Sequence, residues 1–207
     1  MQSHYKDALI QIITFLERLE ETHKIKYHLV GGILVNLYSD FRTTRDIDLA
    51  ISFKESSIST NDYIELLKQN NFKAYQDWES AKTLAKEISM IQFLDTSETI
   101  RFDNHIVVYS TPNQYKKIGP LSMKRRVRAT VFGVECWVSS KEDFILSKLV
   151  YGGWQDYRDA LGCWMRFKED LDIPYLKEKS KLLNIEKEFT LLESGIEDPD
   201  EFFERLA

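Results

Sequence analysis

The sequence predicts an α+β protein in which a mixed β-sheet flanked by helices is followed by a small C-terminal helical bundle. Two patterns support this prediction. Up to residue 138, short β-prone runs alternate with segments of helical periodicity, whereas from residue 141 onward only helical periodicity remains. We therefore divide the chain into a core at residues 1–138 and a C-terminal helical domain at residues 139–207, with no Pro- or Gly-rich linker between them.

The composition is that of a globular chain and excludes several classes of protein. Apolar residues make up 43% and charged residues 29% of the sequence, which is unlike a disordered or collagen-like chain. The net charge of −5 argues against a protein that coats nucleic acid through bulk charge. No apolar run approaches the roughly 20 residues that cross a bilayer, and residues 1–5 are polar where a secretory signal would be apolar. We expect a cytoplasmic protein with no membrane partner.

The first half of the core begins with a helix, because apolar residues recur at helical spacing in residues 6–21. A short β-prone run then stops at Gly31-Gly32, which we expect to form a turn from a strand into a helix. Residues 46–53 alternate between apolar and polar side chains, as in a strand with one buried face. The predicted elements are helices at 6–21, 33–38, 61–69 (capped by Ser59 or Thr60) and 79–87, strands at 27–30 and 46–53, and a polar loop at 39–45.

The second half of the core contains two predicted hairpins. The β-prone runs 90–94 and 99–109 are separated by polar residues, and the run 129–138 turns around Gly133. A basic stretch at residues 112–128 lies between the hairpins. Beyond Ser139, glycine, proline and asparagine separate amphipathic helices predicted at 141–150, 155–168, 173–183 and 185–192.

Two glycines and two acids give the sharpest functional signal. Gly31-Gly32 are followed, after residues 33–45, by Asp46 and Asp48 on a predicted strand. Carboxylates at positions i and i+2 of a strand project from the same face, where they can bind a hard cation such as Mg²⁺ that prefers oxygen ligands. A glycine turn lets backbone amides approach a phosphate closely. Together these features predict a site for a metal ion and a triphosphate.

The alternative for Asp46 and Asp48 is an ordinary pair of acids on a solvated strand edge. The flanking Ile47, Leu49 and Ile51 instead indicate a buried strand, on which unpaired carboxylates are costly. A bound cation would remove that cost.

The runs HLVGG at residues 28–32 and TTRDIDL at residues 43–49 resemble the signature of the nucleotidyltransferase superfamily, which has the polymerase-beta-like fold. Within it, they look like the abortive-infection (AbiEii-like) type IV toxin nucleotidyltransferases. The resemblance covers roughly residues 27–165 in the right order. It implies a mixed sheet flanked by helices, a Mg²⁺-dependent attack on the α-phosphate of a nucleoside triphosphate such as ATP, and pyrophosphate as the leaving group.

The resemblance also implies a role for each site residue. Asp46, Asp48 and Asp103 would be the catalytic and metal-binding carboxylates, with Asp103 either completing the metal site or accepting the proton of the attacking hydroxyl. Lys148 would pair with the β- and γ-phosphates as a mobile point charge. The nucleotide-binding residues that it implies are Gly31, Gly32, Thr44, Arg45 and Lys148.

The sequence departs from the family pattern in two places. Asn104 and His105 follow the third acid, where relatives often have a hydrophobic residue. The Arg and Lys that commonly precede the position of Asp156 are missing. The sequence therefore supports the roles of Asp103 and Lys148 less firmly than it supports the roles of Asp46 and Asp48.

Several of these residues also have ordinary structural explanations. Asp103 could be a strand-end acid in water, and Lys148 could extend its stem along the edge of the core. Asp156 and Asp159 have the helical spacing at which pairing with Lys148 or Arg158 is ordinary. The basic run could guide an RNA backbone into the site, or it could form a solvated basic face; its members are Lys124, Arg125, Arg126 and Arg128.

The leading hypothesis is transfer of a nucleoside monophosphate to an acceptor hydroxyl, with Mg²⁺ as cofactor and a nucleoside triphosphate as substrate. The acceptor could be RNA, a protein or a small molecule, and the toxin resemblance implies tRNA or a cognate antitoxin protein as partners. Two alternatives remain. One is modification of a small, antibiotic-type acceptor by the same chemistry, and the other is a catalytically silent nucleotide-binding or protein-interaction module of the same fold.

Overall fold

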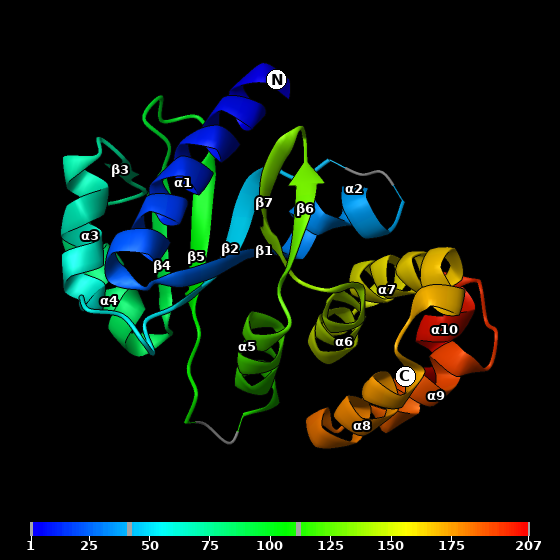
Figure 1. Cartoon of the computed structure of the whole chain (residues 1–207). Helices are drawn as coiled ribbons and strands as arrows, with labels where there is room; N and C mark the ends of the chain where they lie inside the picture. The colour runs from blue at the N-terminus through cyan, green and yellow to red at the C-terminus, as the bar shows by residue number, and fades with distance from the viewer. Residues whose placement is uncertain (1, 41–42, 111–112, 207) are drawn as a thin grey trace.

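The computed structural model describes residues 2–40, 43–110 and 113–206, and a seven-stranded sheet forms its centre (Figure 1). The strand order is β3-β4-β5-β2-β1-β7-β6. β2 runs parallel to β5 and β1 runs parallel to β7, while the other neighbouring strands are antiparallel. The predicted α+β class with a mixed sheet is confirmed. The strands are β1 Lys26–Val30, β2 Asp46–Ser52, β3 Lys73–Ala74, β4 Met90–Leu94, β5 Arg101–Ile106, β6 Val127–Val131 and β7 Val134–Val138.

Helices flank the sheet and continue beyond it. In Figure 1, α3 and α4 lie beside β3 and β4, whereas α6 to α10 gather on the other side of the molecule. In the described part of the chain, no helix combines the length and the apolar character that a membrane crossing requires. The helices are α1 Gln2–His23, η1 Gly31–Leu34, α2 Val35–Tyr38, α3 Thr60–Gln69, α4 Trp78–Glu87, α5 Gln114–Lys124, α6 Lys141–Tyr151, α7 Trp154–Phe167, η2 Lys168–Asp170, α8 Ile173–Leu183, α9 Glu186–Glu193 and α10 Pro199–Leu206.

Polar caps fix where important helices begin. The Ser59 hydroxyl accepts a hydrogen bond from the Asp62 amide at 3.2 Å, and the Asp62 carboxylate accepts one from the Ser59 amide at 2.8 Å. This reciprocal arrangement identifies Ser59 as the cap of α3. Ser140 caps α6 by accepting from the Asp143 amide at 3.1 Å. The cap of α6 matters for the site, because this helix carries Lys148.

The central strand β2 separates the core from the candidate site. Its apolar residues Ile47, Leu49 and Ile51 are fully buried, while Asp46 and Asp48 on the other face are partly exposed. One cluster of buried apolar side chains draws its members from the sheet and from the C-terminal helices alike. Residues 1–138 and residues 139–207 therefore share one buried core. The division of the chain into two domains between residues 138 and 139 stays a prediction.

The structure differs from the sequence prediction at several elements. The helix expected at 33–38 is a 3₁₀ turn followed by one turn of α-helix, and the strand expected at 99–109 ends at Ile106. The prediction contains neither the two-residue β3 nor α10. The expected loop at 39–45 and the basic stretch that starts at Pro112 extend over residues outside the described part.

The main difference is α5, which occupies most of the stretch that the prediction leaves without an element. Asn113 starts this helix by accepting a hydrogen bond from the Tyr115 amide at 2.8 Å. Gly119 and Pro120 lie inside it. Because glycine and proline normally interrupt helices, their presence conceals the helical pattern in the sequence.

Candidate active site

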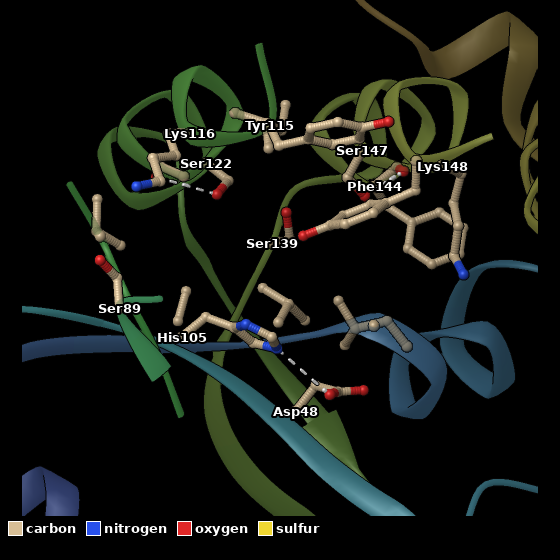
Figure 2. A pocket seen from close by; sticks show the side chains of 18 of the residues that line it. Asp48, Ser89, His105, Tyr115, Lys116, Ser122, Ser139, Phe144, Ser147 and Lys148 are labelled. Carbon is tan, nitrogen blue, oxygen red and sulfur yellow. Dashed lines mark hydrogen bonds and ion pairs between the residues drawn. The ribbon is translucent and has the colours of Figure 1, made fainter. Parts of the chain in front are cut away.

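A cavity of about 470 Å³ lies between the sheet on one side and helices α5 and α6 on the other. Figure 2 shows Asp48 and His105 on the strands, with Tyr115 and Lys116 from α5 and Ser147 and Lys148 from α6 across from them. The glycines at the start of η1 also contribute. The polar and glycine residues that line it are Gly31, Gly32, Asp48, Ser89, His105, Tyr115, Lys116, Gly119, Ser122, Ser139, Ser147, Lys148, Tyr151 and Asp156.

Gly31 and Asp48 meet at the end of β1. The pairing of β1 with β2 places Val30 opposite Asp48, so that the next residue, Gly31, passes beside the carboxylate. Gly31 has a φ of +68°, a left-handed conformation that side chains other than glycine adopt at a cost. A β-carbon at this position would lie 2.9 Å from the β-carbon of Asp48. Glycine is therefore required here both by the turn and by the close approach to the acid.

The three predicted carboxylates lie on one face of two neighbouring strands. In the register of β2 with β5, Asp48 pairs with Asp103 and Asp46 pairs with Arg101. Arg101 donates to Asp46 at 2.5 Å and forms an ion pair with Asp103 at 3.0 Å. Gln92 on β4 also donates to Asp103, at 3.1 Å. The sheet therefore brings the acids together, and an arginine that sequence reasoning assigned no role bridges two of them.

Charge repulsion among the acids is visible at Asp103. Burial raises the pKa of Asp103 above its usual range, and the negative charges of Asp48 and Asp46 raise it further. The positive charge of Arg101 and the hydrogen bond from Gln92 act in the opposite direction. An additional cation near these carboxylates would be stabilising, because it would offset the remaining repulsion.

The fit of this face to Mg²⁺ follows from its donors. Carboxylate oxygens suit a hard cation, and Asp48 faces the cavity with the His105 imidazole 3.6 Å from its carboxylate. Asp46 and Asp103 do not line the cavity. Among the described residues, no group of three or more His, Cys, Asp or Glu side chains is gathered closely enough to hold a metal ion. The donor chemistry fits at Asp48, while coordination by all three acids requires Arg101 to release Asp46 and Asp103.

Lys148 lines the cavity but its charge is already matched by two acids. Its ammonium lies 2.7 Å from Asp156 and 2.8 Å from Asp159, and the lysine side chain is only 7% exposed. This is the pairing that the sequence offered as the ordinary explanation. Lys116, which the sequence did not single out, also lines the cavity and makes no side-chain hydrogen bond or ion pair with the described residues.

The remaining predicted nucleotide-binding residues lie in different places. Gly32 lines the cavity next to Gly31, whereas Thr44 and Arg45 do not. Thr44 donates a hydrogen bond to the Asp46 carboxylate at 3.0 Å, so it orients an acid instead of facing the cavity. The helix after the glycines is too short to provide a strong dipole, because its α-helical part spans only Val35–Tyr38.

The three arginines of the basic run pair with acids of the same chain. Arg126 donates to Glu20 at 3.1 Å, and Arg128 pairs with Glu17 and Glu135. Arg125 lies 3.5 Å from Glu142 on α6. These pairs favour the interpretation of the run as a structural and solvated basic face over a groove for RNA phosphates.

Two polar residues flanking the site are explained by packing. His28 is fully buried, and its Nε2 lies 3.0 Å from the Ser122 hydroxyl. Burial, with a further contribution from the charge of Arg126, lowers the pKa of His28 to about 3, so this imidazole is neutral. Asn104, also fully buried, donates to the Tyr63 hydroxyl at 2.6 Å on the face of β5 opposite Asp103.

Comparisons with known proteins give little beyond this geometry. No protein-family model matches the chain, and no curated protein matches its sequence. One solved structure that it resembles is an antigenic nucleotidyltransferase-like protein from Paracoccidioides brasiliensis, with 16% identity and a TM-score of 0.41 over 76% of this chain and 75% of that chain. A likeness at this level does not assign an activity to this chain.

Proposed function

We propose that this protein is a Mg²⁺-dependent nucleotidyltransferase that moves a nucleoside monophosphate from a nucleoside triphosphate to an acceptor hydroxyl. The observation that carries the proposal is the contact of the Gly31 turn with Asp48 at the base of a cavity that also contains two lysines. Asp48 on the sheet side of the cavity and Lys116 on α5 supply an acid and a cation, a combination that suits a metal-bound polyphosphate. The signature that resembles nucleotidyltransferases supplies the residues of this contact.

Each residue has a role that follows from its position. Asp48, joined by Asp46 and Asp103 once Arg101 releases them, would hold Mg²⁺, which when bound neutralises charge on the transferred phosphoryl and on the leaving pyrophosphate. Gly31 and Gly32 line the cavity, where their backbone would approach phosphate oxygens. Lys116, which has no ion pair with a described residue, would bring a positive charge to the β- and γ-phosphates from α5, and Lys148 lines the cavity from α6.

The bond changes define what the residues must accomplish. The acceptor oxygen forms a bond to the α-phosphorus, the bond between that phosphorus and the α–β bridging oxygen breaks, and pyrophosphate leaves. The hydroxyl proton passes to a base, for which Asp103 is the candidate if Asp46 and Asp48 alone hold the metal, because burial and the neighbouring acids raise the pKa of Asp103. Positioning of the two reactants and electrostatic stabilisation supply most of the catalysis in such reactions.

The acceptor is proposed to be a protein or small molecule in preference to an RNA backbone. The observation behind this choice is that Arg125, Arg126 and Arg128 are paired with acids of the same chain, which leaves Lys124 as the one member of this run with no ion pair to a described residue. A cognate antitoxin protein fits the protein alternative, and an antibiotic-type molecule fits the other. Modification of tRNA would need contacts elsewhere on the surface.

A second candidate function is a catalytically silent nucleotide-binding module. The bridge from Arg101 to Asp46 and Asp103 favours it, because a guanidinium that stays in place occupies both carboxylates and offsets one of their two negative charges without any metal. Such a module would bind a triphosphate at the lysines and would transfer nothing.

The test offers each α-labelled nucleoside triphosphate with Mg²⁺ to total RNA, to cell protein and to a panel of hydroxyl-bearing small molecules. The matched variants are Asp48→Asn, which removes one charge inside the cavity, and Asp170→Asn, which makes the same change at an exposed residue outside it. Label that moves to one acceptor class with wild type and Asp170→Asn, but not with Asp48→Asn, supports the proposal and names the acceptor. Triphosphate binding with no transfer to any acceptor would favour the silent module.

A further inference from the structure

Two exposed tyrosines meet at the cavity. Tyr115 lies in the first turn of α5 and Tyr151 is the last residue of α6, so the packing of these two helices brings the rings together. Their ring centroids are 5.5 Å apart with an interplanar angle of 36°. Tyr115 is 45% exposed and Tyr151 is 56% exposed, although both line the cavity. A pair of large rings left open beside a cavity is a surface on which a planar ligand can stack.

The tyrosine pair belongs to the same cavity as the charged groups. Lys116 follows Tyr115 directly on α5, and Lys148 lies one helical turn before Tyr151 on α6. Although the Tyr151 side chain is largely exposed, the surroundings of its hydroxyl raise its pKa, first through burial and then through the negative charges of Asp48 and Asp156. A single elongated ligand in this cavity can therefore reach both the two tyrosine rings and the charged side chains of Asp48, Lys116 and Lys148.

We propose that Tyr115 and Tyr151 form a stacking platform for the base of the nucleoside triphosphate, a proposal that rests on the proposed function. The two rings already contact each other, so the base packs on their open faces and does not slide between them. Stacking of this kind accepts any base, because every base has a π-face. The platform therefore increases affinity for all nucleoside triphosphates to a similar extent and contributes nothing to binding of the phosphates alone.

The test measures equilibrium binding in EDTA, where no transfer occurs, with ATP, GTP, CTP, UTP and inorganic tripolyphosphate as probes. The variants Tyr115→Leu and Tyr151→Leu remove the rings, Tyr115→Phe and Tyr151→Phe keep them, and Phe203→Leu removes an exposed aromatic ring outside the cavity. Each Leu variant is expected to weaken binding of all four nucleotides by about 5- to 100-fold while leaving tripolyphosphate unchanged. The Phe variants and Phe203→Leu should bind like wild type.

A second measurement needs no variant. In the proton NMR spectrum of bound nucleotide, the base protons should shift upfield because they lie over aromatic rings, whereas the ribose protons should move less. The platform is refuted if wild type binds tripolyphosphate as tightly as nucleotides, if the Leu variants bind nucleotides normally, or if they lose tripolyphosphate to the same degree. Ring-dependent binding in EDTA, combined with no transfer in the labelling assay with Mg²⁺, would keep the platform and refute the proposed catalysis, so the two failures can be told apart.

Discussion

The β-carbon that any other residue would carry at position 31 would lie 2.8 Å from the Cγ of Asp48. The turn that ends β1 and the acid at the base of the cavity therefore depend on each other. Asp48 can keep its position only while residue 31 has no side chain.

Replacement of Gly31 by alanine should damage the fold through Asp48. The left-handed backbone alone costs about 1–2 kcal/mol for alanine, and forcing the new methyl against Asp48 adds about 1–3 kcal/mol of overpacking. In an Asp48→Gly background the second cost disappears. Urea unfolding of the four proteins in this double-mutant cycle should give a coupling free energy of about 1–3 kcal/mol. Additive effects would mean that the two residues do not contact each other.

The two cavity lysines should respond differently to removal of their charge. Lys148→Met removes the buried ammonium that pairs with both Asp156 and Asp159, which should lower the free energy of unfolding by about 3 kcal/mol. Lys116→Met breaks no ion pair with a described residue and should change stability by less than about 0.5 kcal/mol, yet it should weaken binding of tripolyphosphate. Thermal unfolding and equilibrium dialysis separate the two effects. If Lys148→Met keeps full stability but loses tripolyphosphate binding, then Lys148 binds the phosphates and does not have the structural role predicted for it.

Stability should fall in mild acid because of His28. The folded protein keeps this imidazole neutral down to about pH 3, whereas the unfolded chain binds a proton near the usual His pKa of about 6.5. The contribution of His28 is therefore fully present above pH 6.5 and is lost progressively as the pH falls toward 3. The slope should approach about 1.4 kcal/mol per pH unit, which amounts to roughly 2 kcal/mol at pH 5.

The control for this prediction is His28→Gln, which cannot titrate. Urea unfolding of both proteins between pH 7.5 and 5 should give curves whose difference follows the titration of a single imidazole. The acids that titrate in both proteins cancel in this comparison. Curves that remain parallel over the whole range would show that His28 does not lose its proton on folding.

Removal of Arg101 should make the acids more available to cations. Arg101→Met takes away the guanidinium that bridges Asp46 and Asp103, so Mg²⁺ or Mn²⁺ should bind more tightly, while Asp103 loses a partner and the fold loses stability. Isothermal titration with each metal checks the first effect without any turnover. Weaker metal binding by the variant would mean that Arg101 positions the acids for the ion and does not compete with it.

The sequence predicted the part of the site that is local in the chain. The alternation around Ile47 and Leu49 identified β2 and the face of its acids, and the glycine turn identified the end of β1. The contact of Gly31 with Asp48 then follows from antiparallel pairing of neighbouring strands. The predicted roles of Asp46, Asp48 and Asp103 in metal binding stay predictions.

The parts that the sequence did not reveal depend on distant residues. Arg101 bridges two acids only because β5 lies parallel to β2 in one particular register, and register is not legible from either strand alone. Lys116 and Tyr115 remained hidden because Gly119 and Pro120 interrupt the helical pattern of α5. The pairing of Tyr115 with Tyr151 requires the packing of α5 on α6, which no local pattern specifies.

The most direct test of the central claim compares one nucleoside triphosphate labelled at the α-phosphate with the same nucleotide labelled at the γ-phosphate. With Mg²⁺ and the acceptor identified by labelling, the α-label should move to the acceptor and the γ-label should appear in pyrophosphate, in equal amounts. Asp48→Asn should lower both by about 100-fold or more, and Asp170→Asn should change neither. Transfer of the γ-label to the acceptor, or α-label transfer that does not depend on Asp48, would contradict the account.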